Sequence, residues 1–286
     1  MYYGLIILSV VMLSSCFALN DVHRKIQGSS IKVSIRYSAI SSLGGLVALI
    51  VLNGFKPEFT FFTFIMALLT AINGFAFTFC TFRALGNINL SLYSLFSMLG
   101  GMALPSVVGL VFYGEKLTLA KAVCYIFIIT SLLLTVQKGE KKKGTLFYIG
   151  IFTLNGMSGV LNKIFTAAPF KKTSAAGYLI LAAISTFVIA IILLLVFFRK
   201  IEAPKPTPLS ITISSVNGIV NKLANFVLVL ALAHVDASVQ YPMVTGGVMI
   251  MSTIICFFGK NKPSKKEILS VFIAFIGLLL LFLIPV

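Results

Sequence analysis

Charged residues are scarce in this chain. Asp, Glu, Lys and Arg make up 10% of its 286 residues, hydrophobic residues make up 59%, and the mean hydropathy is +1.06. A soluble domain is typically about a quarter charged and roughly half apolar. The composition therefore excludes a water-soluble fold.

Histidine, cysteine and acidic residues are also too few and too scattered for most catalytic or metal-binding sites. The two histidines, His23 and His234, are not part of a cluster of acidic or cysteine residues, and the four cysteines lie far apart without a Cys-x-x-Cys pattern. Enzymatic chemistry and structural metal sites need such clusters. The phosphate-binding loop of an ATPase is missing as well. We expect no enzyme activity, no metal and no cofactor.

Long apolar runs, in contrast, are abundant. A membrane core of about 30 Å is crossed by roughly 20 apolar residues in a helix. Ten such runs lie near residues 2–20, 34–53, 60–82, 89–112, 118–137, 145–166, 174–198, 209–233, 237–258 and 265–284. Some of them, such as 189–198, are continuously apolar, which is typical of a helix in lipid. The sequence predicts an all-α membrane protein with ten transmembrane helices.

The chain divides near its middle, at its densest run of charge. Similar segments recur in the same order on either side of that run; Gly100-Gly101 and Gly246-Gly247, for example, are 146 residues apart. Such recurrence indicates an internal duplication. Because each half holds five helices, the second half has to be inserted upside down relative to the first. We predict two inverted five-helix repeats, residues 1–137 and 145–286, joined by the basic loop 138–144.

Positive charge is concentrated on one side of the predicted bundle. Sixteen of the 23 Lys and Arg residues follow odd-numbered runs, five lie on the opposite side, and Lys163 and Lys222 lie inside runs. The positive-inside rule then places both termini outside the cytoplasm, in a multi-pass plasma-membrane protein. Short basic loops suit anionic lipid headgroups better than nucleic acid, which would need one folded basic face. We expect a small-molecule substrate as a further partner, and the sequence is compatible with a homodimer.

Lys222 is the most informative single residue, because it lies near the middle of the eighth run. A lysine there cannot easily reach the membrane surface, and its insertion costs about 2.5–3.5 kcal/mol. It should therefore face a polar cavity, pair with another group or bind an anionic group. A structural lysine capped by carbonyl groups is the alternative.

Amide side chains accompany this lysine. Asn217, Asn221 and Asn225 recur every fourth residue, so they share one face of the same helix, and this face should point inward. Hydrogen bonding between helices would explain the stripe equally well. We add four polar residues from other runs to the candidate substrate-binding set: Asn73, Asn155, Gln240 and Tyr241.

The fourth and ninth runs contain the only prolines that lie deep within a run, Pro105 and Pro242. Proline frees backbone carbonyls and bends a helix, and glycine allows close packing. We therefore predict that the fourth and ninth helices act as a pair of gates. The gating residues would be Gly100, Gly101, Pro105, Pro242, Gly246 and Gly247. Ordinary kinked packing is the alternative, since proline is common in membrane helices.

All seven carboxylates lie in loops or at helix ends. This argues against a buried carboxylate that carries protons, and we expect these acids, Glu115 included, to be solvated. Lys163 lies near the end of its run, where we expect its side chain to extend towards the membrane surface.

The sequence resembles the drug/metabolite transporter superfamily, specifically its ten-helix EamA-type branch. The resemblance spans essentially the whole chain. It rests on Ala84-Leu85 leading into Ser91, on the segment Phe112 to Thr118 with its Gly114-Glu115-Lys116 element, and on the glycine-bearing helices 5 and 10. In the second half the glutamate is replaced within Lys260-Asn261-Lys262. The resemblance implies a carrier whose cavity is lined by helices 1, 3, 4, 6, 8 and 9. It also implies that both termini lie in the cytoplasm. The charge count predicts the opposite orientation, and we favour the charge count.

These observations predict a secondary transporter that moves a small polar or anionic metabolite by alternating access. Lys222 would meet the negative group of the substrate. Three alternatives stay open: a multidrug or cationic-metabolite exporter, a membrane enzyme or lipid-presenting subunit, and a non-transport structural subunit.

Overall fold

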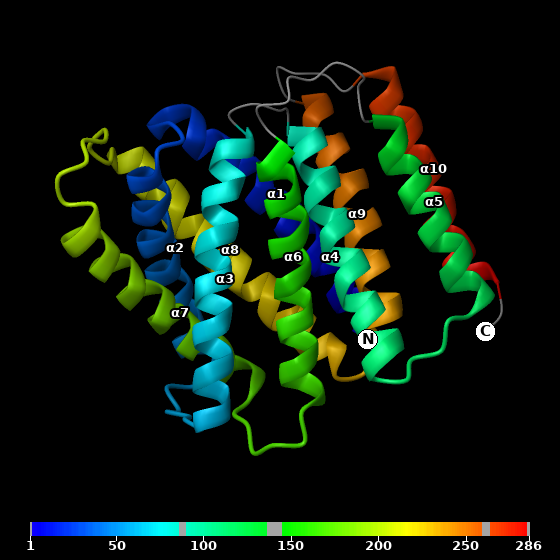
Figure 1. Ribbon diagram of the computed structural model, residues 1–286, viewed down its shortest axis with the longest axis horizontal. Helices are drawn as coiled ribbons and strands as arrows, with labels where there is room; N and C mark the ends of the chain where they lie inside the picture. The colour runs from blue at the N-terminus through cyan, green and yellow to red at the C-terminus, as the bar shows by residue number, and fades with distance from the viewer. Residues whose placement is uncertain (1, 86–89, 136–144, 259–263, 285–286) are drawn as a thin grey trace.

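The structure, a computed structural model, describes residues 2–85, 90–135, 145–258 and 264–284, which form helices joined by loops and contain no strand (Figure 1). The helices are α1 (Tyr2–Gln27), α2 (Ile31–Leu52), α3 (Phe61–Leu85), α4 (Leu90–Phe112), α5 (Leu119–Thr135), α6 (Thr145–Ala167), α7 (Ala175–Ile192), the π-helical turn η2 (Leu193–Phe197), α8 (Pro208–Leu232), α9 (Ala237–Phe258) and α10 (Lys265–Leu283). Each predicted run thus contains one α-helix.

Six of the described helices are long and apolar enough to cross a membrane: α1, α2, α3, α7 with η2, α8 and α9. The prediction of a multi-pass, all-helical membrane protein is confirmed at this level. The predicted end of the first run at residue 20 is too early, because α1 continues to Gln27. Asp21 forms ion pairs with Arg24 and Lys25, three and four residues later, and these pairs favour continuation of the helix.

Local sequence explains where several helices begin. Ser30 caps α2 by accepting a hydrogen bond from the backbone N–H of Val33. Thr207 and Ser210 form a reciprocal capping box at the start of α8, and Pro208 occupies the first helical turn. These caps satisfy backbone donors that a helix end leaves without an internal partner.

The helices pack in an order that differs from their order along the chain. In Figure 1, α2 and α7 lie together at one end of the bundle and α5 and α10 at the other. Between them, α1 packs against α8 and α9, α6 packs against α3 and α4, and α4 also packs against α9. Helices from the two halves of the chain therefore alternate across the centre of the bundle.

Glycines set the closest helix crossings. A Cβ atom on Gly100 of α4 would overlap the backbone of Phe152 in α6, and one on Gly218 of α8 would overlap the backbone of Ser41 in α2. The nearest neighbour of Gly101 is Asn155 of α6. These glycines are required for close packing, as expected where helix backbones touch.

The glycines of α9 make different contacts from those of α4. The atoms nearest to a Cβ on Gly246 belong to Leu278 of α10, and those nearest to one on Gly247 belong to Val10 of α1. The two Gly-Gly pairs therefore do not pack on one another, although α4 and α9 are in contact. Their predicted role in a symmetric gate gains no support from this arrangement.

We predict that Gly100→Ala destabilises the protein while Gly74→Ala does not. The added methyl group at position 100 has to displace the α6 backbone, and overpacking typically costs about 1–3 kcal/mol. Gly74 lies inside α3 with no atom within 4 Å of an added Cβ, so alanine should be neutral or stabilising there. Melting temperatures of the purified variants in detergent test this; equal values for the two variants would contradict it.

Candidate functional site

A cavity of about 250 Å³ lies among the central helices. Among the described residues, its walls come from α1, α2, α3, α4, α6, α7, α8 and α9, but not from α5 or α10. The six helices expected to line a cavity are all present, and α2 and α7 contribute in addition. Serine, threonine and asparagine are the commonest lining residues, and they lie among tyrosine, phenylalanine, leucine, methionine, valine and glycine, so the wall has both polar and apolar surface.

Lys222 of α8 lines this cavity. Its aliphatic stem crosses α2 at Gly45, where any Cβ atom would collide with it, so the glycine provides the space for the side chain. Throughout the described part of the chain, its ammonium group has no hydrogen-bond or ion-pair partner, and no carboxylate lines the cavity. The described wall therefore contains one basic residue and no acidic one.

The asparagine stripe of α8 faces inward, as predicted, and all three amides line the cavity. The Nδ2 group of Asn217 donates to the backbone oxygen of Cys16, at 2.8 Å, and to Oδ1 of Asn20, at 3.3 Å, which ties α8 to α1. Asn225 donates to the backbone oxygen of Asn221, one turn earlier. Asn217 is thus largely structural, Asn225 bonds within its own helix, and Asn221 accepts from Asn225 and also forms a side-chain hydrogen bond with Cys16 of α1.

The structure divides the other four candidate binding residues into two pairs. Asn155 and Tyr241 line the cavity. Asn155 donates to the backbone oxygen of Ser97, and the Tyr241 hydroxyl donates to the backbone oxygen of Gly159. Asn73 and Gln240 are not part of the cavity wall.

The last two amides are used in packing instead. Asn73 is buried and donates from α3 to the backbone oxygen of Leu154 and the hydroxyl of Ser158 in α6. Gln240 is buried and donates to the backbone oxygen of Leu228 in α8. Residue type alone could not distinguish these amides from those that face the cavity.

Sequence reasoning missed the contribution of α2. Tyr37, Ser38, Ser41 and Ser42 line the cavity, and the Tyr37 hydroxyl donates a hydrogen bond to Oδ1 of Asn20. Spacing of three and four residues between these polar side chains was the available signal. It was easily overlooked because serine is common in membrane helices at packing positions.

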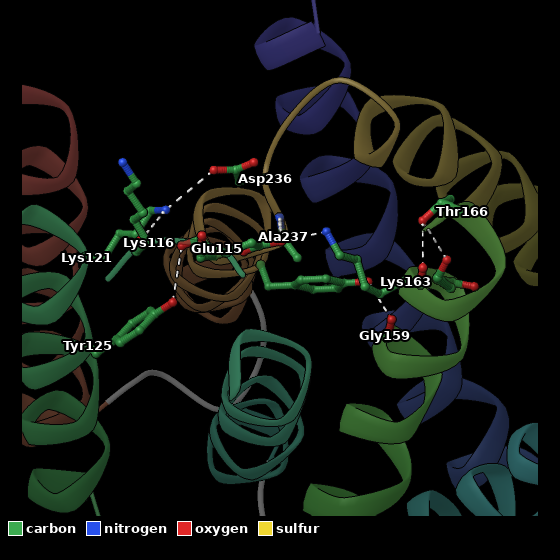
Figure 2. Close-up of polar contacts among 12 residues, drawn as sticks. Glu115, Lys116, Lys121, Tyr125, Gly159, Lys163, Thr166, Asp236 and Ala237 are labelled. Carbon is green, nitrogen blue, oxygen red and sulfur yellow. Dashed lines mark hydrogen bonds and ion pairs between the residues drawn. The ribbon is translucent and has the colours of Figure 1, made fainter. Parts of the chain in front are cut away.

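Glu115 contradicts the expectation that every carboxylate is solvated. Its side chain is only 6% exposed, and Lys163 of α6 lies with Nζ 2.5 Å from Oε1 (Figure 2). The same carboxylate accepts from the backbone N–H groups of Ala237, at 3.3 Å, and Ser238, at 2.9 Å. It therefore caps the N-terminus of α9, where negative charge is favoured. We call Glu115, Lys163, Ala237 and Ser238 the Glu115 cluster.

The loop between α4 and α5 is shaped to present this carboxylate. Gly114 adopts a positive φ of 65°, which favours glycine, and the backbone N–H of Glu115 bonds back to the oxygen of Gly109 in α4. Lys163 lies 5.3 Å from the ring centroid of Tyr113, so its charge is paired on one side and covered by an aromatic ring on another. The expectation that Lys163 extends to the membrane surface is therefore wrong.

The Glu115 cluster lies next to one end of the cavity. Asn162, the residue before Lys163, and Tyr241, one turn after Ser238, both line the cavity wall. The cluster thus joins the first half of the chain to α6 and α9 of the second half beside that end. Lys121 and the exposed Asp236 form a further ion pair there, at 3.5 Å.

Comparison with known proteins supports the fold and nothing finer. Neither a model of a protein family nor a curated protein sequence matches this chain. A protein of known crystal structure superposes with a TM-score of 0.70 and 13% sequence identity, over 96% of this chain and 94% of that one. At this identity the likeness shows that the two chains share a fold.

The pKa of Glu115 lies below the value of 4.5 of an unperturbed glutamate. Burial, the largest contribution, raises the pKa, but the hydrogen bonds from Lys163 and Ser238 together outweigh it. A carboxyl group whose pKa is lowered by folding stabilises the protein above its unfolded pKa. This stabilisation is lost as the pH falls through the lower folded value.

We predict that Glu115→Gln lowers the melting temperature at pH 7 by roughly 5 °C, because charge-assisted hydrogen bonds are lost. The difference from the unmodified protein should shrink as the pH falls below 4.5, where Glu115 begins to be protonated in the unfolded chain, and should vanish only below the lower pKa of the folded protein. Melting curves between pH 3.5 and 8 measure both effects.

Glu58→Gln is the matched control for this experiment. Glu58 also accepts hydrogen bonds at the start of a helix, α7, from the backbone N–H and hydroxyl of Ser174 at 2.6 and 2.7 Å. It is partly exposed, and among the described residues no lysine forms an ion pair with it, although, besides the Ser174 hydrogen bonds, the nearby charge of Lys56 helps to lower its pKa. Its replacement should cost less than half as much. An equal effect at both positions would contradict a special contribution from the buried pair.

Proposed function

We propose that the protein is a secondary transporter that moves a small polar or anionic metabolite by alternating access. The observation that carries this proposal is the unpaired ammonium group of Lys222 in a polar cavity among apolar helices. An uncompensated charge inside a membrane protein is costly, and it is typical of a substrate or ion pathway. A structural subunit would have no need for such a cavity.

The pattern of helix contacts supports ten spans arranged as two inverted repeats. When each helix of the first half is exchanged with its counterpart five helices later, the contacts of α1 with α8 and α9 become those of α6 with α3 and α4. The contact of α2 with α8 likewise becomes that of α7 with α3. Such pseudo-symmetry supports repeats at 1–137 and 145–286. The proposed place in the EamA-type branch of the drug/metabolite transporter superfamily rests on the sequence resemblance at Ala84 to Ser91 and Phe112 to Thr118.

Alternating access requires contacts between the halves that break on one side of the cavity while others form on the opposite side. The Glu115 cluster is such a contact, since Glu115 belongs to the first half and Lys163 and Ser238 to the second. Pro105 of α4 lies near this cluster, because its ring packs at Gly159 of α6, next to Tyr241. We propose that α4 bends at Pro105 when the contact opens. In this proposal the Glu115 cluster opens when that end of the cavity opens.

Export of cations is the less favoured transport function. A cationic substrate would have to share the cavity with Lys222, and the described wall offers no carboxylate to compensate the second charge. Like charges at close range in a low-dielectric cavity repel strongly.

We predict that Lys222→Ala reduces substrate uptake by at least about tenfold, the typical effect of losing one charge-assisted hydrogen bond. The measurement is uptake of a broad metabolite panel into liposomes that contain the purified protein. Lys171→Ala, which removes an exposed lysine outside the cavity, should leave uptake unchanged. Full uptake by a Lys222→Ala protein with an unchanged melting temperature would contradict this role.

The charge distribution further predicts that both termini lie outside the cytoplasm at the plasma membrane. Single cysteines introduced at Lys200, in the segment between α7 and α8, and at Lys171, between α6 and α7, should therefore react from opposite sides. In intact cells a membrane-impermeant maleimide should label position 171 and not position 200. The four native cysteines are first replaced by alanine, because Cys80 is partly exposed, although Cys16 and Cys124 are buried. Labelling at position 200 and not at position 171 would show that the orientation is the opposite of the predicted one.

A further inference from the structure

The charge of the cavity wall restricts the substrate more closely than the function proposed above, on which this inference rests. We infer that the cavity takes a small hydroxylated monocarboxylate, that is, a substrate with one negative charge, no positive charge and several hydroxyl groups. The argument combines the charge balance of the wall with the hydrogen-bonding groups that the protein leaves unused.

The charge balance favours a monoanion. Lys222 is the one basic residue of the described wall, and no acidic residue stands beside it. A single carboxylate would make the occupied cavity electrically neutral. A dianion would leave one negative charge without a partner, and burial of an unpaired charge is strongly unfavourable.

Lys163 cannot serve as a second cation for such a dianion. Its ammonium already lies 2.5 Å from Glu115, and its side chain is 12% exposed. Binding a second negative group there would require the ion pair with Glu115 to break. Phosphate esters and dicarboxylates are therefore disfavoured by the same geometry.

The balance also disfavours amino acids. An amino acid brings an ammonium group together with its carboxylate, and an ammonium buried in a cavity needs an anionic partner or several acceptors. The described wall has no carboxylate to offer it. A hydroxyl in place of the amino group removes this requirement and keeps a similar size.

Unused amide groups suit hydroxyl substituents. Asn155 and Asn225 donate through Nδ2 to protein oxygens, and their Oδ1 atoms have no partner among the described residues. Asn162 does the reverse: its Oδ1 accepts from the Tyr178 hydroxyl at 3.3 Å, and its Nδ2 has no partner there. All three amides line the cavity. A hydroxyl group donates and accepts, so it can satisfy either kind of amide atom.

The test is a panel of six-carbon compounds that differ mainly in charge: gluconate, glucose, glucarate, gluconate 6-phosphate and 2-amino-2-deoxygluconate, with glycerate as a smaller hydroxy acid. The purified full-length protein is reconstituted in phosphatidylethanolamine and phosphatidylglycerol liposomes, and uptake of labelled gluconate and glycerate is measured with the others as competitors. We expect saturable uptake of at least one hydroxy acid. Each competitor of another charge should be at least about tenfold weaker.

Lys222→Gln and Lys171→Gln distinguish a role of the cavity charge from a general loss of cations. Lys222→Gln should reduce the preference for gluconate over glucose to within about twofold, whereas Lys171→Gln should retain it. Melting temperatures establish that both variants are folded.

The outcomes separate the two proposals. Stronger competition by a dianion, by the zwitterion or by glucose than by the unlabelled hydroxy acids would overturn this inference and leave the transporter function standing. An unchanged preference in folded Lys222→Gln would overturn it as well. Absence of uptake of any compound, in this panel and in the broad metabolite panel, would overturn the transporter function and the inference with it.

Discussion

Charge compensation in a low-dielectric interior is the constraint on which this structure depends. The described helices bring few ionisable side chains into the bundle, and most of these are paired or at helix ends. Lys222 is the exception, because it lies mid-helix, without a partner among the described residues, at the wall of a cavity. The free energy that other buried charges obtain from partners must come, for this lysine, from water or a ligand. A cavity that holds water or a ligand therefore accounts for the presence of an unpaired lysine at this position.

The two lysines inside predicted helices have opposite environments, and backbone geometry causes the difference. Lys163 is reached by Glu115 because Gly114 turns the chain back at the end of α4 and points the carboxylate at α6 and α9. The chain thus contains one paired lysine beside the end of the cavity and, among the described residues, one unpaired lysine in its wall.

Much of the fold could be predicted from sequence, since hydrophobic length and charge placement determine where helices lie in a membrane protein. The ten helices occur where the apolar runs predict them, and the inward face of the Asn217 stripe follows from its four-residue spacing. The extension of α1 to Gln27 was missed because its last turn is polar, although Asp21 with Arg24 and Lys25 was a readable helix signal.

The site was less predictable than the fold, because tertiary contacts decide which polar groups remain free. Asn73 and Asn155 are similar in sequence context, yet one bonds α3 to α6 and the other lines the cavity. Glu115 looked like an ordinary loop carboxylate, and its burial depends on α6 and α9, which lie far along the chain. Gly45 has no chemistry of its own, but it makes room for Lys222. Pairing of this kind is a property of three-dimensional neighbours, which one sequence does not display.

The same distribution of charge gives a physical reason for coupling between substrate and gate in the proposed carrier. The Glu115 cluster joins α6 and α9 beside one end of the cavity, and none of its four residues lines the cavity wall. Lys222 is sensitive to occupancy, because an anion would neutralise it and allow the surrounding amides to be desolvated at lower cost. Closure around an occupied cavity is then favoured over closure around an empty one. The difference is the free energy gained when the bound anion neutralises Lys222. Such a difference between two states is what a ligand needs in order to shift a conformational equilibrium, and here it arises from one charge for which the described helices provide no partner.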